Sequence, residues 1–436
     1  MMALRTFALE VHNKAGNLQG EIKDLSITSL IVTGTMNASD FYFIDDHLKH
    51  LESLDLSGAT VVPCNVPVTR YFKSEFAADE LPVAALADMP QLAAIVLPRG
   101  LKVIGQGALA GCDRLTAITF PDNLETIGDY AFAGCSALQH VTLPPAVVTV
   151  GKGAFMRCGA LERFEAAPSS QLASLGDWAL MDCQALTHID LGPSLQSIGE
   201  RALAGTQLTV LDLSGSPRLE QVGDWLMVLT PVEQAKMPGS LKRMGDGIFL
   251  CDSTLTHIDL STKLTAVSDY LLAGTALTGD LTLPAVETVG NFALYNVSTL
   301  SSVALPATLT FMGNRAMAGM TGMTALSCRA SNVPELGDEV WAGVNQSQVP
   351  LDIPPAARFK YRDADQWREF LFRDYGVIGD VNGDGEVNIA DVNLLIAMVL
   401  SHGNVYSDDV VARADVNMDG EINVADINAV ISIILS

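Results

Sequence analysis

The chain has 436 residues, of which 50 are acidic and 26 basic, and its formal net charge is −24. Such a surface repels polyanions, which argues against nucleic acid or an anionic membrane as a partner. No apolar run approaches the roughly 18 residues of a membrane-spanning helix, and seven cysteines are too few and too odd in number for a disulfide scaffold. The length allows two or three domains with a large core.

The N-terminus reads "MMALRTFALEVHNKAGN" and lacks the uninterrupted apolar stretch of a signal peptide. We expect the native signal to have been replaced by the leading Met. The expected location of the protein is therefore still outside the cell, either secreted or on the cell surface.

Between residues 81 and 350 the sequence repeats itself. "LKVIGQGALAGCDRLTAITFP" (101–121) is followed by "LETIGDYAFAGCSALQHVTLP" (124–144), and a degenerate unit occupies 81–98. A period near 23 is in the range of leucine-rich repeats, so we predict an α/β solenoid of about 11–12 repeats. Each unit is marked by an apolar residue, followed by Gly in all but one case, and successive marks are 22 to 25 residues apart: Ile104, Ile127, Val150, Leu175, Ile198, Val222, Met244, Val267, Val289, Met312 and Leu336.

Each repeat contains a short strand with alternating sides. In "ALQHVTLP" (137–144), we expect Leu138, Val141 and Leu143 to point inward, and His140 and Thr142 to stand on the surface.

The "IGDYAFAGC" segment is expected to form a helical or irregular turn on the opposite side, with Ile127, Ala131 and Phe132 in the core. No single repeat can bury its own apolar side, so neighbouring repeats must stack into one continuous core.

The consensus "LxxIGxxAFxxCxxLxxIxLP" resembles the BspA-like leucine-rich repeat family of bacterial surface and secreted proteins. The segments 27–61 and 349–370 resemble the N-terminal and C-terminal caps of such proteins. The resemblance implies adhesion or binding without a transferable functional motif. The expected domains are an N-terminal cap with the first strands (1–80), the repeats (81–348), a C-terminal cap (349–375) and a further module (376–436).

The exposed strand face is the expected ligand surface, because curvature gathers many side chains on one side of a solenoid. Its middle is acidic and spans roughly 20 Å, which suits a basic or hydroxyl-rich protein or glycan ligand. A solvated face without a ligand is the alternative. The residues concerned are Glu165, His188, Asp190, Asp212, Lys236, His257 and Asp259.

No catalytic constellation is visible, and we predict that the chain is not an enzyme. There is no serine in a nucleophile elbow, no phosphate-binding loop and no spaced carboxylate pair. His140 and His188 would lie about 10 Å apart, too far to share a metal ion. One cysteine per repeat follows the repeat period and not a zinc-site spacing, so buried structural thiols are expected at Cys112, Cys135, Cys158 and Cys183.

The chain ends with two nearly identical acidic dodecapeptides, "DVNGDGEVNIAD" (380–391) and "DVNMDGEINVAD" (415–426). Each places oxygen-bearing side chains at positions 1, 3, 5, 9 and 12 and Gly at position 6, as a calcium loop requires. We predict two calcium ions, with Asn at position 9 binding directly or through water and Glu at position 7 using its carbonyl. The predicted ligands are Asp380, Asn382, Asp384, Glu386, Asn388 and Asp391, and Asp415, Asn417, Asp419, Glu421, Asn423 and Asp426.

Apolar helices are predicted after each loop, at 389–401 and 424–436, whereas the glycines of "DYGVIG" (374–379) disfavour a helix before the first. This duplicated unit resembles a type I dockerin domain, which implies a small α-helical calcium-binding domain that docks onto a cohesin partner. The resemblance places partner contacts at Ile389, Ala390, Val424 and Ala425, an apolar set.

Two classes of function remain open. The first is a non-catalytic binding or adhesion protein, whose dockerin-like module docks onto a cohesin-type partner or onto its own solenoid. The second is a dockerin-tethered enzyme of polysaccharide or protein breakdown with an unrecognised active site. An intracellular calcium sensor is disfavoured by the lack of predicted incoming helices.

Overall fold

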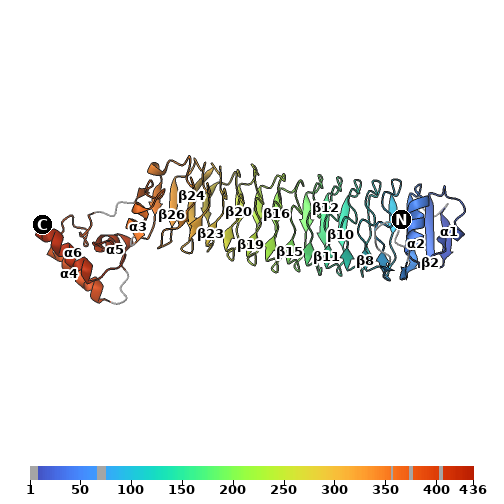
Figure 1. Cartoon of the computed structure of the whole chain (residues 1–436), viewed down its shortest axis with the longest axis horizontal. Coiled ribbons are helices and arrows are strands. Elements are labelled where there is room, and N and C mark those ends of the chain that lie inside the picture. Colours follow the sequence, from blue (N-terminus) through green and yellow to red (C-terminus); the bar gives the residue numbers. More distant parts are fainter. Residues whose placement is uncertain (1–7, 66–74, 355–356, 373–376, 402–405) are drawn as a thin grey trace. The chain divides into compact units, whose positions relative to one another are not determined.

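The computed structural model describes residues 8–65, 75–354, 357–372, 377–401 and 406–436. Clustering of contacts divides the chain into two compact units, Met1–Lys263 and Leu264–Ser436. In both units, short parallel strands from successive repeats stack one above the next (Figure 1). The fold is therefore a parallel β-solenoid followed by a small helical module, as the repeat period and the terminal helices predict.

The first unit exposes one ladder of strands, which we call the strand face. It consists of three parallel sheets, in the orders β1-β2-β3-β7, β10-β12-β14 and β16-β18-β20. Its strands are β1 (Leu9–Asn13), β2 (Ser29–Met36), β3 (Ser53–Val61), β7 (Ala94–Val96), β10 (His140–Leu143), β12 (Arg163–Ala166), β14 (His188–Asp190), β16 (Val210–Asp212), β18 (Gln234–Lys236) and β20 (His257–Asp259).

A second ladder of eight two-residue strands runs through the same repeats, and each strand beyond the first ends at a predicted repeat mark. They are β6 (Glu80–Leu81), β8 (Val103–Ile104), β9 (Thr126–Ile127), β11 (Thr149–Val150), β13 (Ser174–Leu175), β15 (Ser197–Ile198), β17 (Gln221–Val222) and β19 (Arg243–Met244).

The Gly that follows all but one of the marks allows successive repeats to pack backbone against backbone. A Cβ built on Gly176 would lie 2.6 Å from the carbonyl carbon of Gly151, and one on Gly128 would lie 2.7 Å from the carbonyl oxygen of Ile104. Because these obstacles are backbone atoms of the preceding repeat, a side chain here would force the two repeats apart.

The core lies between the two ladders. Leu138, Val141 and Leu143 are buried and His140 and Thr142 are exposed, so the predicted alternation is confirmed. The turn residues Ile127, Ala131 and Phe132 are also fully buried.

The "IGDYAFAGC" segments form successions of turns, with no helix. In most repeats two residues four apart adopt left-handed backbone conformations, for example Tyr130 (φ 54°) with Gly134 (φ 75°), and Trp178 (φ 57°) with Asp182 (φ 59°). Hydrogen bonds between repeats hold these strained residues, as when the Trp178 N–H donates to the Glu200 carbonyl at 2.8 Å.

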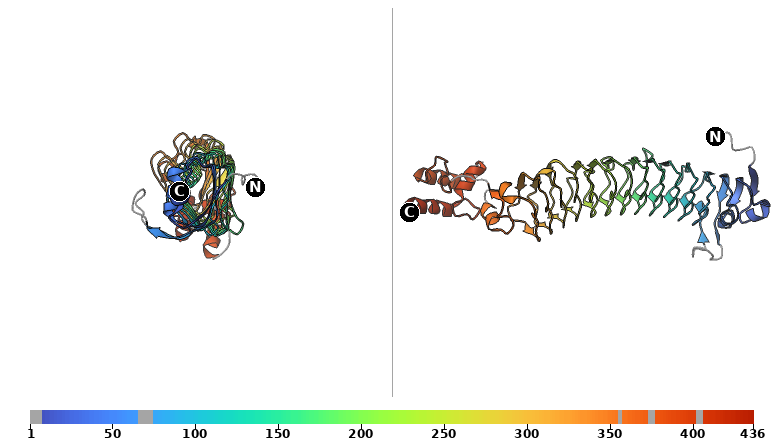
Figure 2. Two further views of the ribbon diagram at one scale, coloured as in Figure 1. Left: turned by 90° about the vertical axis from the view of Figure 1, so that its right-hand side faces the viewer. Right: turned by 90° about the horizontal axis from the view of Figure 1, so that it is seen from above.

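The N-terminal end of the first unit contains the helices α1 (Leu18–Glu21) and α2 (Ala38–His47). Asp40 is buried in the first turn of α2, and its carboxylate accepts the N–H groups of Gly16, Leu18 and Asn37 at 2.7 to 3.0 Å. The antiparallel strands β4 (Cys64–Asn65) and β5 (Glu75–Phe76) form a ribbon that extends from the side of the stacked repeats (Figure 2).

The second unit has the same two kinds of ladder. One has the order β21-β23-β25-β27 and the other β22-β24-β26-β28-β29. After β28 the chain forms a short helix whose Tyr361 packs edge-on against Trp367, which in turn contacts Trp341. The elements are β21 (Ala266–Val267), β22 (Gly279–Thr282), β23 (Thr288–Val289), β24 (Leu300–Leu305), β25 (Phe311–Met312), β26 (Ala325–Cys328), β27 (Glu335–Leu336), the 3-10 helix η1 (Gln346–Gln348), β28 (Pro350–Asp352), α3 (Arg358–Asp363) and β29 (Leu371–Phe372).

The C-terminal module, residues 377–401 and 406–436, contains α4 (Ile389–Leu400), α5 (Asp408–Ala414) and α6 (Val424–Leu435). The two apolar helices follow the acidic loops as predicted. Helix α5 was not predicted, and it leads directly into the second loop. Before the first loop, the described residues 377–379 form a bend and a turn.

Candidate metal centre

The two acidic loops have the same local structure because each is built into the start of a helix. Asn388 is the N-cap of α4, and its side chain accepts the Ala390 N–H at 2.8 Å. Asn423 caps α6 in the same way and accepts the Ala425 N–H at 2.7 Å. Loop position 9 thus fixes where each helix begins.

The aspartate at position 12 closes the loop on itself. Asp426 is fully buried, and its Oδ1 accepts the N–H groups of Val416 and Asn417 at 2.8 and 3.0 Å. Its Oδ2 accepts the Asn423 N–H at 2.9 Å and so completes a capping box. Asp391 is equally buried and bonds the first loop in the corresponding way, through Asn382 and Asn388.

The aspartate at position 1 organises the other half of each loop. The Asp380 carboxylate accepts the N–H groups of Gly383, Asp384 and Gly385 at 2.8 to 3.0 Å. The peptide groups must turn sharply to point at one carboxylate, and Gly385 does so with φ at 94°.

The second loop repeats this arrangement with Asp415, which accepts the N–H groups of Asp419 and Gly420. Gly420 has φ at 87°, and Met418 at position 4 is also left-handed, with φ at 68°.

Carboxylates converge in the second loop. Oxygen atoms of Asp415, Asp419 and Asp426 all lie within 4.8 Å of one another. Burial raises the pKa of Asp415; the N–H of Gly420 lowers it, and the charges of Asp426 and Asp419 raise it further. In the first loop, which the structure also describes, the three corresponding side chains do not meet that distance.

The donor set of both loops fits a hard divalent cation of calcium size. All side chains at positions 1, 3, 5, 9 and 12 offer oxygen, and calcium takes six to eight oxygens at about 2.3–2.6 Å. The amide oxygen of Asn388 already accepts the Ala390 N–H, so a water or an ion at position 9 would share this oxygen with the helix cap. The turn at position 6 is formed in both loops.

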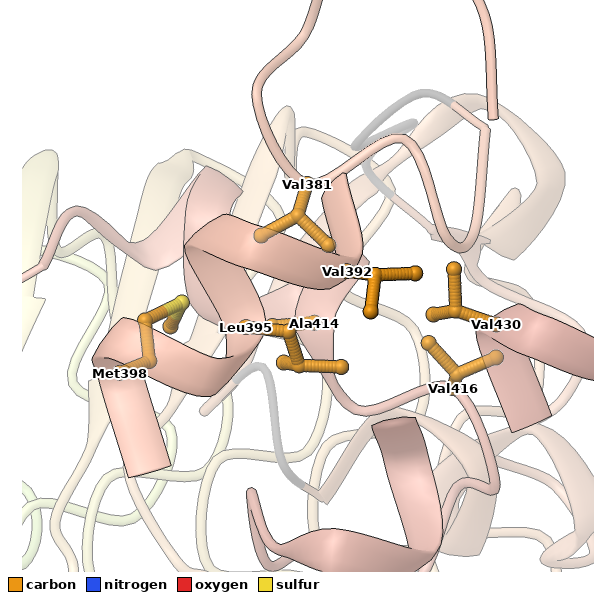
Figure 3. Packing of buried hydrophobic residues seen from close by; sticks show 7 residues of the cluster. All are labelled: Val381, Val392, Leu395, Met398, Ala414, Val416 and Val430. Carbon is orange, nitrogen blue, oxygen red and sulfur yellow. The ribbon is translucent and has the colours of Figure 1, made fainter. Parts of the chain in front are cut away.

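The loops and the core of the module share residues. Val381 and Val416, at position 2 of the two loops, are buried with Val392, Leu395 and the other core residues in Figure 3 (Met398, Ala414 and Val430). Position 8 of each loop, Val387 and Ile422, packs against the same cluster. Movement of either loop would therefore disturb the core between the helices.

The predicted partner residues point away from this core. Ile389 is 66% exposed and Val424 is 60% exposed, and Ala390 and Ala425 beside them are exposed as well. Further apolar side chains are exposed along the same two helices, namely Ile396, Leu400, Ile431, Ile433, Ile434 and Leu435.

The strand face of the first unit carries two outward rows of side chains. Within a sheet, the residues of each row are aligned by strand pairing. Between sheets, each row is extended by the residues at the same position of the repeat. The first outward row is Ser29, Ser53, Ala94, Ala117, His140, Arg163, His188, Val210, Gln234 and His257. The second outward row is Ile31, Asp55, Val96, Thr119, Thr142, Glu165, Asp190, Asp212, Lys236 and Asp259.

The predicted face residues lie on these rows, and several are already paired. Glu165 contacts Arg163 and lies 3.1 Å from Nε2 of His188. His257 Nε2 is 3.2 Å from the Asp259 carboxylate. Asp190 accepts the Gly192 N–H at 2.9 Å.

Asp212 makes the equivalent turn, and accepts from the Ser214 hydroxyl at 2.6 Å and the Ser214 N–H at 3.0 Å. These hydrogen bonds, the hydroxyl first, lower the pKa of Asp212. Both aspartates therefore hold the turn that follows their strand as well as adding negative charge to the face.

The cysteine ladder is structural. Each of the four thiols is fully buried and donates to a carbonyl of the preceding repeat at 3.2 to 3.3 Å, as Cys135 does to Leu109. Burial raises the pKa of Cys112 and Cys183 to about 12. The burial of all four thiols confirms the prediction of buried cysteines, and each thiol ties its repeat to the one before it.

Where a later repeat has Thr in place of this Cys, its hydroxyl can make the equivalent bond to the preceding repeat, as Thr230 does to the Leu203 carbonyl at 3.1 Å. Asp252 occupies the same slot in another repeat, with only 8% of its surface exposed.

None of the helices in the described part of the chain has the length and apolarity to span a bilayer.

Two family models match the chain. The model described as BspA type leucine rich repeat region matches in six copies, over residues 80–209, 173–285 and 279–349. The model described as Dockerin type I domain matches residues 378–435. No curated protein matches the chain.

Solved structures of bacterial leucine-rich repeat proteins are similar to parts of the chain. One from Bacteroides ovatus is 22% identical, covers 71% of this chain and 91% of its own, and has a TM-score of 0.49. A leucine rich cell surface protein from Faecalibacterium prausnitzii is 18% identical, with 63% and 87% covered and a TM-score of 0.33. The pneumococcal vaccine antigen PcpA is 18% identical, with 66% and 77% covered and a TM-score of 0.35.

The match to the repeat model over more than half of the chain agrees with the stacked parallel strands, and the match to the dockerin model agrees with the two loop-and-helix units. Dockerin type I domains generally bind calcium and dock onto a protein partner. The chain belongs to the BspA-type leucine-rich repeat family and carries a C-terminal type I dockerin domain.

Proposed function

We propose that the chain is a non-catalytic binding protein of the cell surface or the extracellular space, whose dockerin domain (376–436) holds a calcium ion in each loop and docks onto a cohesin-type partner. The observation that carries this proposal is the convergence of Asp415, Asp419 and Asp426 above a core that the loop residues themselves help to form.

The first ion would be held by Asp380, Asn382, Asp384 and Asp391, with the Glu386 carbonyl and with Asn388 acting through water. The second would be held by Asp415, Asn417, Asp419 and Asp426, with the Glu421 carbonyl and with Asn423. Calcium would supply the positive charge that these clustered carboxylates need in order to stay ionised at close range.

Calorimetric titration of calcium into the chelator-treated full chain tests this assignment. We expect an ion bound in each loop, and Asp419→Ala should remove one of them. Glu421→Ala is the matched control, because its exposed side chain is not a proposed ligand. Equal calcium binding by wild type and Asp419→Ala would contradict the assignment.

The docking surface would be the apolar patch around Ile389, Ala390, Val424 and Ala425. These four side chains are exposed at the start of α4 and α6, so a partner can cover them without opening the core. Equivalent positions in the two halves of the domain give a partner two similar surfaces.

Binding of the full chain to a panel of purified cohesin domains, with calcium and with chelator, tests the docking surface. Replacing Ile389 and Val424 together by Asp should abolish binding and leave calcium affinity largely intact. Leu229→Asp changes an even more exposed apolar residue in the repeats and should have no effect. A loss of calcium binding would instead place Ile389 and Val424 in the structural core, contrary to the proposal.

The strand face of the solenoid would bind the ligand that the protein presents. Glu165, Asp190, Asp212 and Asp259 give the second outward row a negative charge that Lys236 interrupts once, which favours a basic or hydroxyl-rich protein or glycan.

Replacing Asp190, Asp212 and Asp259 by Asn removes their charge, and an Asn at 190 and 212 can still hold the turn that follows each strand. Binding to peptide and glycan arrays should then weaken and lose its salt dependence. The wild-type chain should show no turnover of polysaccharide or peptide substrates. Turnover that is lost on changing a strand-face residue would overturn the non-catalytic assignment.

A further inference from the structure

The strand face is hollowed at its N-terminal end. A depression of about 730 Å³ lies over Ala8, β2, β3, β7 and residues 116–121 of the first unit. We call it the N-terminal hollow and define it by its floor, which consists of Ser29, Ser53, Ala94 and Ala117 from the first outward row.

Side-chain size creates the hollow. Its floor residues are Ala or Ser on four consecutive strand positions, whereas the next positions of the same row are His140, Arg163 and His188. Strands lie about 4.8 Å apart, so a run of four small residues leaves a depression about as long as a short extended peptide. The run of small residues ends at His140, which pairs with Ala117.

The second outward row gives the hollow its chemistry. Asp55 pairs in register with Ile31 on one side and with Val96, 42% exposed, on the other. A carboxylate thus lies between two aliphatic side chains. The Asp55 carboxylate is held in place because its Oδ1 accepts the Ser57 N–H at 2.9 Å.

These features select among classes of ligand. A sugar ring usually stacks on an exposed aromatic face, but Phe120, the aromatic residue among the lining side chains, is only 7% exposed. An acyl chain would cover Asp55 and the hydroxyls of Ser29 and Ser53 without offering them any hydrogen-bonding partner, which is unfavourable. A peptide offers both backbone polar groups and a side chain of opposite charge.

We propose that the N-terminal hollow binds an extended peptide segment that carries an aliphatic side chain two residues from a basic one. Alternate side chains of an extended chain point to the same side, about 6.6 Å apart. Asp55 and Ala94 are diagonal neighbours on adjacent strands, roughly 7–8 Å apart. The aliphatic group therefore fills the space above Ala94 while the basic group meets Asp55. This site is separate from the acidic part of the second outward row and from the dockerin domain.

Phage-displayed random hexapeptides, selected on the immobilised full chain, provide the probe. Enriched clones should share Leu, Ile or Val two residues from Lys or Arg. The corresponding fluorescein-labelled peptides should bind Ala94→Trp and Ala117→Phe at least tenfold more weakly, because the new side chains fill the hollow. Asp55→Asn keeps the turn to Ser57 and should weaken binding about fivefold, with a smaller dependence on salt.

Two matched variants lie outside the hollow. Val210→Phe enlarges an exposed residue of the first outward row, and Asp24→Asn alters an aspartate off the strand face that makes the same turn with Ser26. Both should leave peptide affinity unchanged. Because Ala117 is exposed, its substitution does not disturb the core, and an unchanged circular dichroism melt of each variant verifies this.

Enrichment without a shared pattern, or selected peptides that bind all variants equally, would overturn the proposal. Three further measurements test other occupants: binding of a fluorescent fatty acid, binding to a glycan array, and sedimentation of the chain alone to detect a dimer. If one of these occupants binds saturably while no hexapeptide is enriched, and Ala117→Phe eliminates that binding, the hollow belongs to that occupant, which would contradict a peptide site.

Discussion

The repeats of the first unit and the dockerin domain use the same side chain, aspartate, to satisfy backbone N–H groups, but they distribute it differently. In the repeats, Asp129, Asp177 and Asp224 each accept the N–H of a residue in the next repeat at 2.9 Å. In the second calcium loop, three carboxylates meet within 4.8 Å.

The contrast shows how spacing decides whether aspartate needs a cation. Repeats stack at about 4.8 Å, and the three ladder aspartates stand on alternate repeats, so solvent can screen their charges. Carboxylates gathered in one loop repel each other across a partly buried space. We infer that the repeats hold their aspartates without help, whereas the dockerin domain depends on calcium.

Removing one aspartate from each region should show the largest difference in stability between the two regions. Asp426→Ala deletes the acceptor of three N–H groups, one of them buried and two partly buried, and hydrogen bonds to charged groups contribute about 1.5–3 kcal/mol each. We expect the dockerin domain not to fold even with calcium present. Asp224→Ala in the repeats deletes one exposed hydrogen bond and should cost about 1 kcal/mol or less.

Amide hydrogen–deuterium exchange, measured by mass spectrometry, distinguishes the two variants. In Asp426→Ala, protection should be lost over α4, α5 and α6 and retained in the repeats. A protected dockerin domain in Asp426→Ala would show that neither the loop bonds nor the ion is needed.

The repeats should be most sensitive where backbones meet. Gly176→Ala places a Cβ 2.6 Å from the carbonyl carbon of Gly151, so two repeats must separate and unfolding free energy should fall by about 1–3 kcal/mol. Gly159→Ala is the control, because its Cβ would meet no atom within 4 Å. Denaturant unfolding followed by circular dichroism measures both, and an equal loss in the two variants would contradict the packing argument.

Replacing Asp252 should have the smallest effect on the free energy of unfolding, and it should raise that free energy where the other substitutions lower it. Its Oδ2 is buried without a hydrogen-bond partner, and burial raises its pKa although the Thr254 hydroxyl and N–H lower it. The ionised form is thus disfavoured in the folded state. Asp252→Asn should stabilise the chain by about 1 kcal/mol at pH 7.

This gain should shrink as the pH falls through the raised pKa of Asp252 towards the ordinary carboxyl value, because the wild type then becomes protonated and no longer carries the penalty. Melting curves of both proteins between pH 4 and 7 measure the difference. A gain that stays constant with pH would exclude ionisation of Asp252 as its cause.

Much of the solenoid could be predicted because its signals are periodic. The repeat marks ended short strands as far as Leu336, and Leu138, Val141 and Leu143 pointed inward, since stacking leaves an apolar residue no other place. The left-handed positions could not be predicted. Tyr130 and Trp178 adopt them as readily as the glycines of other repeats, because hydrogen bonds from the neighbouring repeat decide their conformation.

The dockerin domain was predictable for a different reason. Its loops are defined by oxygen donors at fixed positions, and the capping boxes at Asn388 and Asn423 follow from the same residues. Helix α5 escaped prediction because it has only seven residues and no side-chain N-cap bond, so its position depends on packing around Val410 and Ala414. The N-terminal hollow emerged only when strand register placed Ala94 and Ala117 side by side.

Differential scanning calorimetry of the full chain, with calcium and with excess chelator, tests the dependence of the dockerin domain on calcium most directly. We predict two transitions with calcium, of which chelator removes the one that belongs to the dockerin domain and leaves that of the repeats nearly unmoved, because binding energy is folding energy for a small metal-dependent domain. A single transition that chelator does not change would contradict the calcium assignment and the separation of the two regions alike.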